Sequence, residues 1–126
     1  MSAFDSVAEA EARAELAVAQ GGLGEQLQFV HEGAAAVPIW VREVSADSAR
    51  IAEGLQVANE RVSVFRVATG QTGFSRPTND TEPVCEGDEF SRNSRVYVVR
   101  GIGKNVGKSV YTLACVQRKT KNFGGT

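Results

Sequence analysis

The sequence predicts a mainly β protein, a small antiparallel β-barrel or sandwich with one N-terminal α-helix. Between residues 83 and 118, apolar side chains recur at every second position in short segments, the period with which a strand buries one face. An acidic, alanine-rich segment precedes two glycines near the start, and the 126 residues suit one domain. We therefore expect a helix within residues 1–22 and a β-barrel domain over 23–126, with a long loop at about 69–82.

The first expected element is a helix over Ser2–Gln20. Ser6 and Glu9 have the spacing of a capping box, and alanine and glutamate favour the helical state. Two glycines at 21–22 are expected to end it. Its apolar stripe consists mostly of small side chains: Phe4, Val7, Ala8, Leu16 and Ala17. Because a helix gains most of its stability from packing, we expect this one to pack on the barrel or on a neighbouring subunit. Phe4 and Val7 are therefore candidate partner-binding residues.

Three strands are expected before the long loop, over residues 26–32, 37–44 and 61–68. Trp40, on the second, is interpreted as a core or inter-sheet anchor in preference to a ligand-stacking platform. The segment 45–54 reads as a loop with one turn of helix. In the third strand, alternation places two sets of side chains on opposite faces: Val62, Val64 and Arg66 on one, Phe65 and Val67 on the other.

The strands after the long loop follow a turn at residues 86–88. Gly87 can adopt the left-handed conformation of a tight turn, and Asp88 can hydrogen-bond nearby backbone. The expected buried face comprises Phe90, Val96, Val98, Ile102, Val110, Thr112, Ala114 and Val116. The side chains between them are polar or adaptable: Tyr97, Arg100, Tyr111, Gln117 and Arg118.

The loop Thr69–Glu82 is rich in glycine, hydroxyl and amide residues. Phe74 is its one large apolar residue, and Arg76 follows two positions later. An exposed aromatic residue close to an arginine is typical of a protein-docking anchor. Alternatively, Phe74 is buried under its own loop. On the docking interpretation, alanine at both positions leaves the fold intact and weakens partner binding.

The segment Gly101–Ser109 imitates a phosphate-binding loop because it ends in Gly-Lys-Ser. The required earlier glycine is replaced by Ile102, and a β-like segment follows where a helix is needed. We therefore interpret it as a hairpin connection with Lys104 and Lys108 at its tip. With the basic residues that follow (Arg118, Lys119 and Lys121), they are candidates for contact with duplex DNA, and Tyr97 and Tyr111 are the plausible stacking platforms of a single-strand binder.

Neither a metal, a cofactor nor an enzymatic activity is expected. Cys85 and Cys115 are too few and too widely separated for a zinc cage, and the one histidine, His31, adds no ligand pattern. Reduced thiols and a barrel-rim imidazole are the preferred interpretations. No apolar stretch approaches the roughly 20 residues of a membrane helix, and the start does not resemble a secretion signal, so folding in the cytoplasm is expected.

Charge is unevenly divided along the chain. Residues 1–60 carry ten acidic against three basic residues, and residues 61–126 carry eleven basic against five acidic ones. If the fold separates these portions, complementary faces favour a head-to-tail ring of identical subunits. If the charges intermix on one surface, they indicate only solubility.

The order of these segments resembles the head-to-tail joining proteins, also called head-completion or stopper proteins, of long-tailed bacteriophages. The resemblance covers nearly the whole chain and rests on an acidic N-terminal helix, Pro38-Ile39-Trp40-Val41-Arg42, Val62–Val67, a long loop, the Pro83–Phe90 turn, Tyr97-Val98-Val99 and Tyr111–Val116. It implies a barrel that forms a homo-oligomeric ring between the portal or adaptor of the filled head and the tail. Such a ring is a virion part that retains DNA and docks the tail.

On this resemblance, Lys104, Lys108, Arg118 and Lys119 become DNA-channel candidates, with non-specific duplex contact. The length of the 69–82 loop leaves open a tail-terminator or tail-completion role in the same neck region. The competing class is a cytoplasmic nucleic-acid-binding barrel, in which Tyr97 would join the basic residues on one face.

Overall fold

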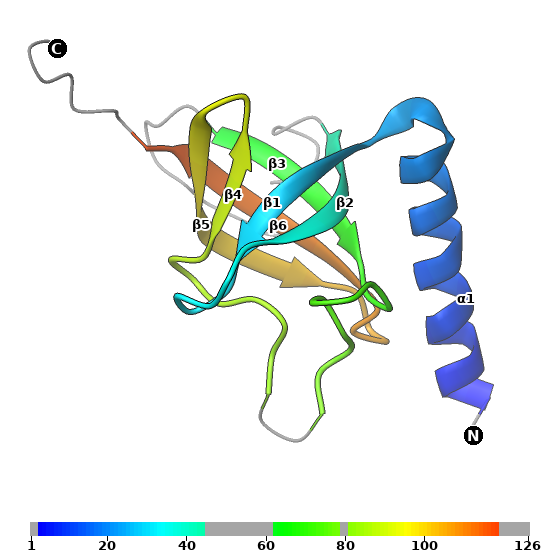
Figure 1. Ribbon diagram of the computed structural model, residues 1–126. Coiled ribbons are helices and arrows are strands. Elements are labelled where there is room, and N and C mark those ends of the chain that lie inside the picture. Colours follow the sequence, from blue (N-terminus) through cyan, green and yellow to red (C-terminus); the bar gives the residue numbers. More distant parts are fainter. Residues whose placement is uncertain (1–2, 45–61, 79–80, 119–126) are drawn as a thin grey trace, which may run out of the picture.

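The computed structural model describes residues 3–44, 62–78 and 81–118, with side chains from Ser6 onward. It confirms a mainly β protein with an N-terminal helix: six antiparallel strands close into a barrel in the order β1-β2-β3-β6-β5-β4 (Figure 1). The elements are α1 (Ala3–Val18), a π-type turn η1 (Ala19–Leu23), β1 (Glu25–Val30), β2 (Val37–Val44), β3 (Val62–Ala68), β4 (Glu89–Arg92), β5 (Arg95–Lys104) and β6 (Val110–Gln117). The turn expected within 45–54 lies outside the described residues.

Aromatic side chains fill the barrel interior. Phe29 stacks on Phe90 with ring centroids 4.7 Å apart, and Phe65 meets Tyr97 edge-on at 5.7 Å. Aliphatic side chains complete the core: Leu27, Ile39, Val41, Val67, Val84, Val99 and Leu113. A barrel of so few strands has room inside only for its own side chains. Its functional contacts therefore belong to its outer surface and its ends.

The face expected to be buried is wrong by one residue in β6 and in the part of β5 before its bulge, whereas Ile102 packs against the core as expected. Tyr97 and Val99 of β5 point into the core, and Val96 and Val98 are only partly buried. In β6 the inward set is Tyr111, Leu113 and Cys115. The outward residues of β6 from Val110 to Ala114 are also buried, so hydrophobicity on both faces left the inward face undetermined. The face assignment in β3 is confirmed, with Phe65 and Val67 inside.

Trp40 was expected to be a core or inter-sheet anchor but is half-buried on the outer side of β2. Its neighbours Ile39 and Val41 are fully buried inside. The backbone of Trp40 is bound by the Gln71 side chain, whose Oε1 accepts from the Trp40 N–H (2.7 Å) and whose Nε2 donates to the Trp40 carbonyl (3.1 Å). Nε2 also donates to the Ala68 carbonyl at 2.9 Å. This amide therefore links β2 to the end of β3.

The helix lies along the outside of the barrel, against β3 and β6, which is the first of the two packing partners expected for it (Figure 1). Its buried residues, Ala8 and Ala12, are small, which lets the helix approach closely. α1 begins at Ala3, so Ser6 lies inside it and is not the expected N-cap. Termination at the glycines is confirmed: Gly22 has a φ of 112°, and the Gly24 N–H donates to the Ala19 carbonyl at 3.0 Å.

Candidate functional site

Most of the polar and titratable side chains with candidate functions lie at one end of the barrel. Because the strands are antiparallel, the connections β1–β2 (residues 31–36), β3–β4 (residues 69–88) and β5–β6 (residues 105–109) meet at the same end, where α1 also begins (Figure 1). We call this the loop end. The opposite end carries the β4–β5 turn and Arg118.

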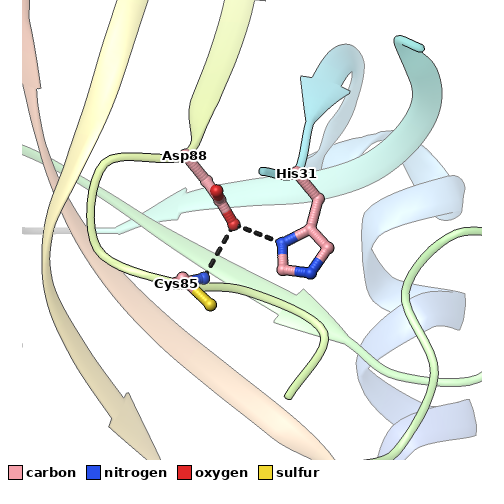
Figure 2. Close-up of side chains that lie close together, drawn as sticks. All are labelled: His31, Cys85 and Asp88. Atoms are coloured by element: carbon pink, nitrogen blue, oxygen red, sulfur yellow. Dashed lines mark hydrogen bonds and ion pairs between the residues drawn. The ribbon is translucent and has the colours of Figure 1, made fainter. Parts of the chain in front are cut away.

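At the loop end, three residues far apart in the sequence come together: His31, Cys85 and Asp88 (Figure 2). Asp88 is buried, and its Oδ2 accepts hydrogen bonds from His31 Nδ1 (2.6 Å) and the Cys85 backbone N–H (2.7 Å). The expectation that His31 adds no ligand pattern is therefore wrong. A separation of 57 residues between the imidazole and the carboxylate explains why spacing along the chain gave no signal.

Both cysteines are free, as expected. Burial, and next the negative charge of Glu32, raise the pKa of the Cys85 thiol. Burial in the barrel core raises the pKa of Cys115 further. Neither thiol therefore has the lowered pKa of a catalytic cysteine.

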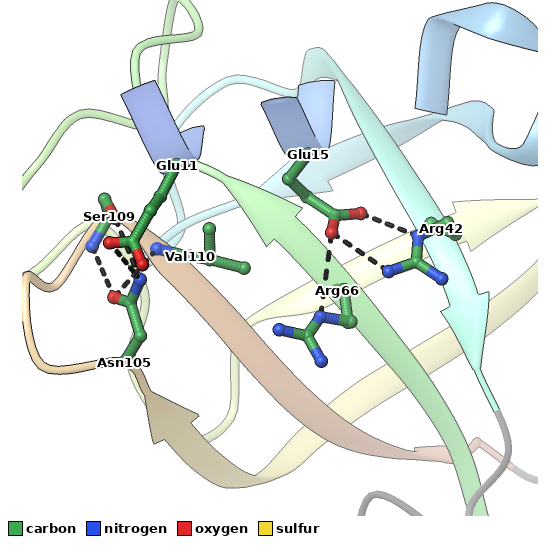
Figure 3. Close-up of polar contacts among 7 residues, drawn as sticks. All are labelled: Glu11, Glu15, Arg42, Arg66, Asn105, Ser109 and Val110. Atoms are coloured by element: carbon green, nitrogen blue, oxygen red, sulfur yellow. Dashed lines mark hydrogen bonds and ion pairs between the residues drawn. The ribbon is translucent and has the colours of Figure 1, made fainter. Parts of the chain in front are cut away.

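An ion-pair cluster fastens α1 to the barrel wall. Glu15, whose side chain is only 10% exposed, accepts two hydrogen bonds from Arg42, at 2.8 Å from Nε and 3.0 Å from Nη2 (Figure 3). Arg66 Nε lies 3.7 Å from the same carboxylate. Arg42 and Arg66 face each other across β2 and β3, so one carboxylate spans both strands. The hydrogen bond to Glu15 raises the pKa of Arg42.

The β5–β6 connection is held rigidly and rests on the helix (Figure 3). Asn105 Oδ1 accepts from the backbone N–H groups of Ser109 (2.8 Å) and Val110 (3.2 Å), and its Nδ2 donates to Glu11 at 3.3 Å. Gly107 lies against Ala8, since a Cβ built on it would stand 2.8 Å from the Ala8 Cβ. Figure 3 shows the Asn105 side chain directed at Glu11 of the helix.

Two exposed valines flank this contact between the connection and the helix. Val106, at the tip, is 86% exposed, and Val7, on α1, is 57% exposed. They neighbour Gly107 and Ala8 in the sequence, so both lie at the loop end. The exposure of Val7 is compatible with its expected role in partner binding, which stays a prediction. The side chain of the second helix candidate, Phe4, lies outside the described residues.

Phe74 is not the exposed docking anchor of the first interpretation. It is fully buried, with its ring 5.7 Å from Phe29 and 5.5 Å from Tyr111, both edge-on. Gly70 and Gly73, with φ of 90° and 89°, let the chain turn back so that the ring enters the core. Replacement of Phe74 is therefore expected to damage the fold, contrary to the docking interpretation.

Arg76 is half-buried, and its hydrogen bond to the backbone has a structural role. Its Nη2 donates to the Gly107 carbonyl at 2.9 Å, joining the β3–β4 connection to the β5–β6 connection. With Arg13 and Glu9 of α1, it lines a groove of about 400 Å³ between the helix and the start of the β3–β4 connection. The loop end thus has a firm frame and a groove beside the helix.

The basic DNA-channel candidates do not form one patch. Lys104 lies at the loop end, 3.2 Å from Glu82, and Lys108, four positions further along the chain, is exposed. Arg118 lies at the opposite end, about 26 Å away along the eight residues of β6, and pairs with Glu89. Lys119 lies outside the described residues.

The expected stacking platforms are wrong as well. Tyr97 and Tyr111 are buried in the core, at 3% and 0% exposure. The Tyr111 hydroxyl donates to Glu82 Oε1 at 2.8 Å, which lowers the pKa of that carboxyl. Burial, followed by this hydrogen bond, raises the pKa of Tyr111.

The acidic and basic portions of the sequence intermix in the described residues. Arg92 of β4 lies 2.7 Å from Glu25 of β1 and 3.0 Å from Glu43 of β2. Arg66, also from the basic portion, reaches Glu15 of the acidic helix. The structure therefore favours the solubility interpretation, and charge division no longer supports ring closure.

None of the described helices is long and apolar enough to cross a membrane. Comparisons with protein families, curated proteins and solved structures find no match to this chain. The function of the chain is therefore inferred from its geometry and from the resemblance in the order of its segments.

Proposed function

We propose that this protein is a structural subunit of the bacteriophage head–tail neck, a stopper that forms a ring, closes the DNA-filled head and docks the tail. The support is the combination of a closed barrel, a helix along its outside and a long connection before β4, in the order that the resemblance implies. Portal or adaptor and tail proteins are its proposed partners, and the virion neck is its proposed location.

The observation that carries the proposal is the construction of the loop end. Val7 and Val106 are exposed apolar side chains on rigid supports, because Gly107 rests on Ala8 and Asn105 fixes the connection internally. Apolar side chains held in place before binding lose little entropy when a partner covers them. We therefore assign docking to these two valines and to the loop end around them.

The competing nucleic-acid barrel receives less support. Tyr97 and Tyr111 are buried, so neither offers a face on which a base can stack. Lys104 and Arg118 are each paired with a carboxylate and lie at opposite ends of the barrel. Among the described residues, the DNA candidate Lys108 has an exposed side chain that forms no ion pair, which suits at most weak contact with duplex phosphates.

The test is co-sedimentation of the purified protein with DNA-filled, tail-less phage heads. We expect stoichiometric capture by the heads. The double variant Val7→Asp and Val106→Asp should lose capture, because two charges would have to be buried at the interface. Leu23→Asp is the matched control: Leu23 is 71% exposed beyond the other end of α1, and this variant should be captured normally.

A salt titration of binding to free duplex DNA accompanies this assay. Little affinity for free DNA is expected. Strong, salt-sensitive DNA binding without capture by heads would contradict the neck assignment and favour the nucleic-acid barrel. Capture by isolated tails but not by heads would instead favour the tail-terminator role.

A further inference from the structure

The cluster at the loop end contains four side chains with metal-binding atoms. His31 and Glu32 belong to the β1–β2 connection, and Cys85 and Asp88 belong to the turn before β4. One ligand atom from each of His31, Cys85 and Asp88 lies within 4.8 Å of the other two. Imidazole, thiolate and carboxylate together are the ligand types of zinc sites.

Asp88 fixes the orientation and the tautomer of His31. As a carboxylate it can only accept, so the 2.6 Å contact places the histidine proton on Nδ1. Its other oxygen, Oδ1, accepts from the Glu32 backbone N–H at 3.0 Å. A neutral imidazole held in this way has its lone pair on Nε2. A carboxylate that binds the far nitrogen is the usual second partner of a metal-binding histidine.

The Glu32 carboxylate lies beside both remaining ligand atoms. Its Oε1 is 3.3 Å from His31 Nε2, and its Oε2 is 3.6 Å from Cys85 Sγ. Neighbouring ligands of a tetrahedral zinc ion with ordinary bond lengths are separated by about 3.3–3.6 Å. Glu32 has a φ of 49°, a conformation costly for a residue with a Cβ, and this conformation brings its N–H to Asp88.

We propose that His31 Nε2, Cys85 Sγ and the Glu32 carboxylate bind a divalent zinc-type ion, with Asp88 as the hydrogen-bond partner of His31. Binding breaks the Cys85 S–H bond and forms a sulfur–metal bond, and the proton passes to solvent. The Glu32 side chain is 67% exposed and that of His31 28%, so the ion can enter from solvent and keep a water ligand. A thiolate and an imidazole select zinc over magnesium or calcium.

The ion would join the β1–β2 connection to the turn before β4. This inference is independent of the neck assignment, because it concerns four side chains that do not include Val7 or Val106. Capture by phage heads and metal binding can therefore succeed or fail separately.

The experiment uses the full chain without a polyhistidine tag, since such a tag binds the same ions. Co²⁺ is titrated into protein freed of metal by a chelator, and the near-ultraviolet absorption of the cobalt–thiolate bond is followed. We expect saturation at one equivalent and displacement of Co²⁺ by Zn²⁺. Mg²⁺ at the same concentration should leave the spectrum unchanged.

Variants assign the signal to the site. Cys85→Ala should abolish the thiolate absorption, and Cys115→Ala, which removes the other thiol, should retain it. His31→Gln and Glu32→Gln should each weaken binding at least about tenfold. Circular dichroism without metal checks that every variant is folded. Absence of a thiolate band in the unaltered chain at saturating Co²⁺, or an unchanged band in Cys85→Ala, would overturn the proposal.

A second measurement needs no variant. Zn²⁺ bound at Cys85 should slow its alkylation by iodoacetamide, read by peptide mass spectrometry. Cys115, which is buried in the core, serves as the internal control, and its alkylation should not respond to the ion. Equal alkylation of Cys85 with and without Zn²⁺ would also overturn the proposal.

Discussion

At the scale of single residues, Phe74 decides whether the β3–β4 connection stays attached to the barrel. Its ring is buried between Phe29 and Tyr111. Phe74→Ala is expected to lower the free energy of unfolding by about 3–5 kcal/mol, the usual cost of such a cavity. Urea denaturation measures it. Arg76→Ala should cost less, and a Phe74 variant as stable as the unaltered protein would contradict the buried position.

Glu82 should make stability depend on acid pH. The hydrogen bond from Tyr111 lowers the pKa of Glu82 below its ordinary value of 4.5. The lowered folded-state pKa means that this stabilisation is complete above the unfolded value and is lost as the pH falls through the folded one. Tyr111→Phe should therefore destabilise the protein more at pH 7 than at pH 3. Denaturation at both pH values tests this, and an equal difference would contradict it.

Predictions for single residues were confirmed where the local backbone conformation allowed only one residue type. Gly22 was correctly expected to end the helix, because its positive φ is unfavourable for other residues. Phe74 had two open interpretations, because residue type alone does not decide whether an aromatic ring in a loop turns inward. The contact of His31 with Asp88 depends on the closure of the barrel between β1 and β4, which short-range spacing does not report.

At the scale of elements, Glu15 is expected to hold α1 on the barrel. Glu15→Ala leaves Arg42 and Arg66 without their shared carboxylate and should cost about 1–3 kcal/mol. Glu9 lies on the same helix and forms no ion pair with the other described residues, so Glu9→Ala is the matched control and should cost little. Thermal denaturation measures both, and hydrogen exchange of α1 should accelerate only in the Glu15 variant. Equal effects would show that alanine packing alone holds the helix.

The contact between Gly107 and Ala8 offers a test by compensation. A Cβ at Gly107 would stand 2.8 Å from the Ala8 Cβ, so Gly107→Ala should push the connection away from the helix and destabilise the protein. Ala8→Gly removes the clash at a helix-propensity cost of about 1 kcal/mol. In a double-mutant cycle, Gly107→Ala should therefore be less harmful in the Ala8→Gly background. Additive effects would mean that the two residues do not touch.

The sequence predicted most strands but misplaced one connection. Strand 37–44 was predicted with its observed bounds, because Val, Ile and Trp favour strands. The expected connection 101–109 is shorter, since β5 continues to Lys104. A bulge between Val99 and Gly101 shifts the register against β6, so Gly101 pairs with Ala114 in the sheet. Glycine is typical of turns, so the sequence alone does not indicate a strand here. The pairing of Gly101 and Gly103 with β6 shows that both belong to the sheet.

At the scale of the whole molecule, the intermixed charges predict how the proposed docking responds to salt. Arg92, Lys104 and Arg118 are already paired within the subunit, and the proposed contact is made by Val7 and Val106. Capture by phage heads should therefore change little between 0.05 and 0.5 M salt, roughly a threefold change in screening length. Sedimentation at both concentrations measures it. Loss of capture at high salt would assign the docking to charged residues.

The closure of the barrel also bears on how copies of the chain avoid sticking to one another. Each of the six described strands has a hydrogen-bonded neighbour on both sides, so none of them offers a free edge to a strand of another molecule. Polymerisation by strand addition would first have to open a seam, and the one between β1 and β4 has only three paired positions. We therefore expect the protein to stay free of strand-mediated aggregation at high concentration until the proposed docking surface binds its partner.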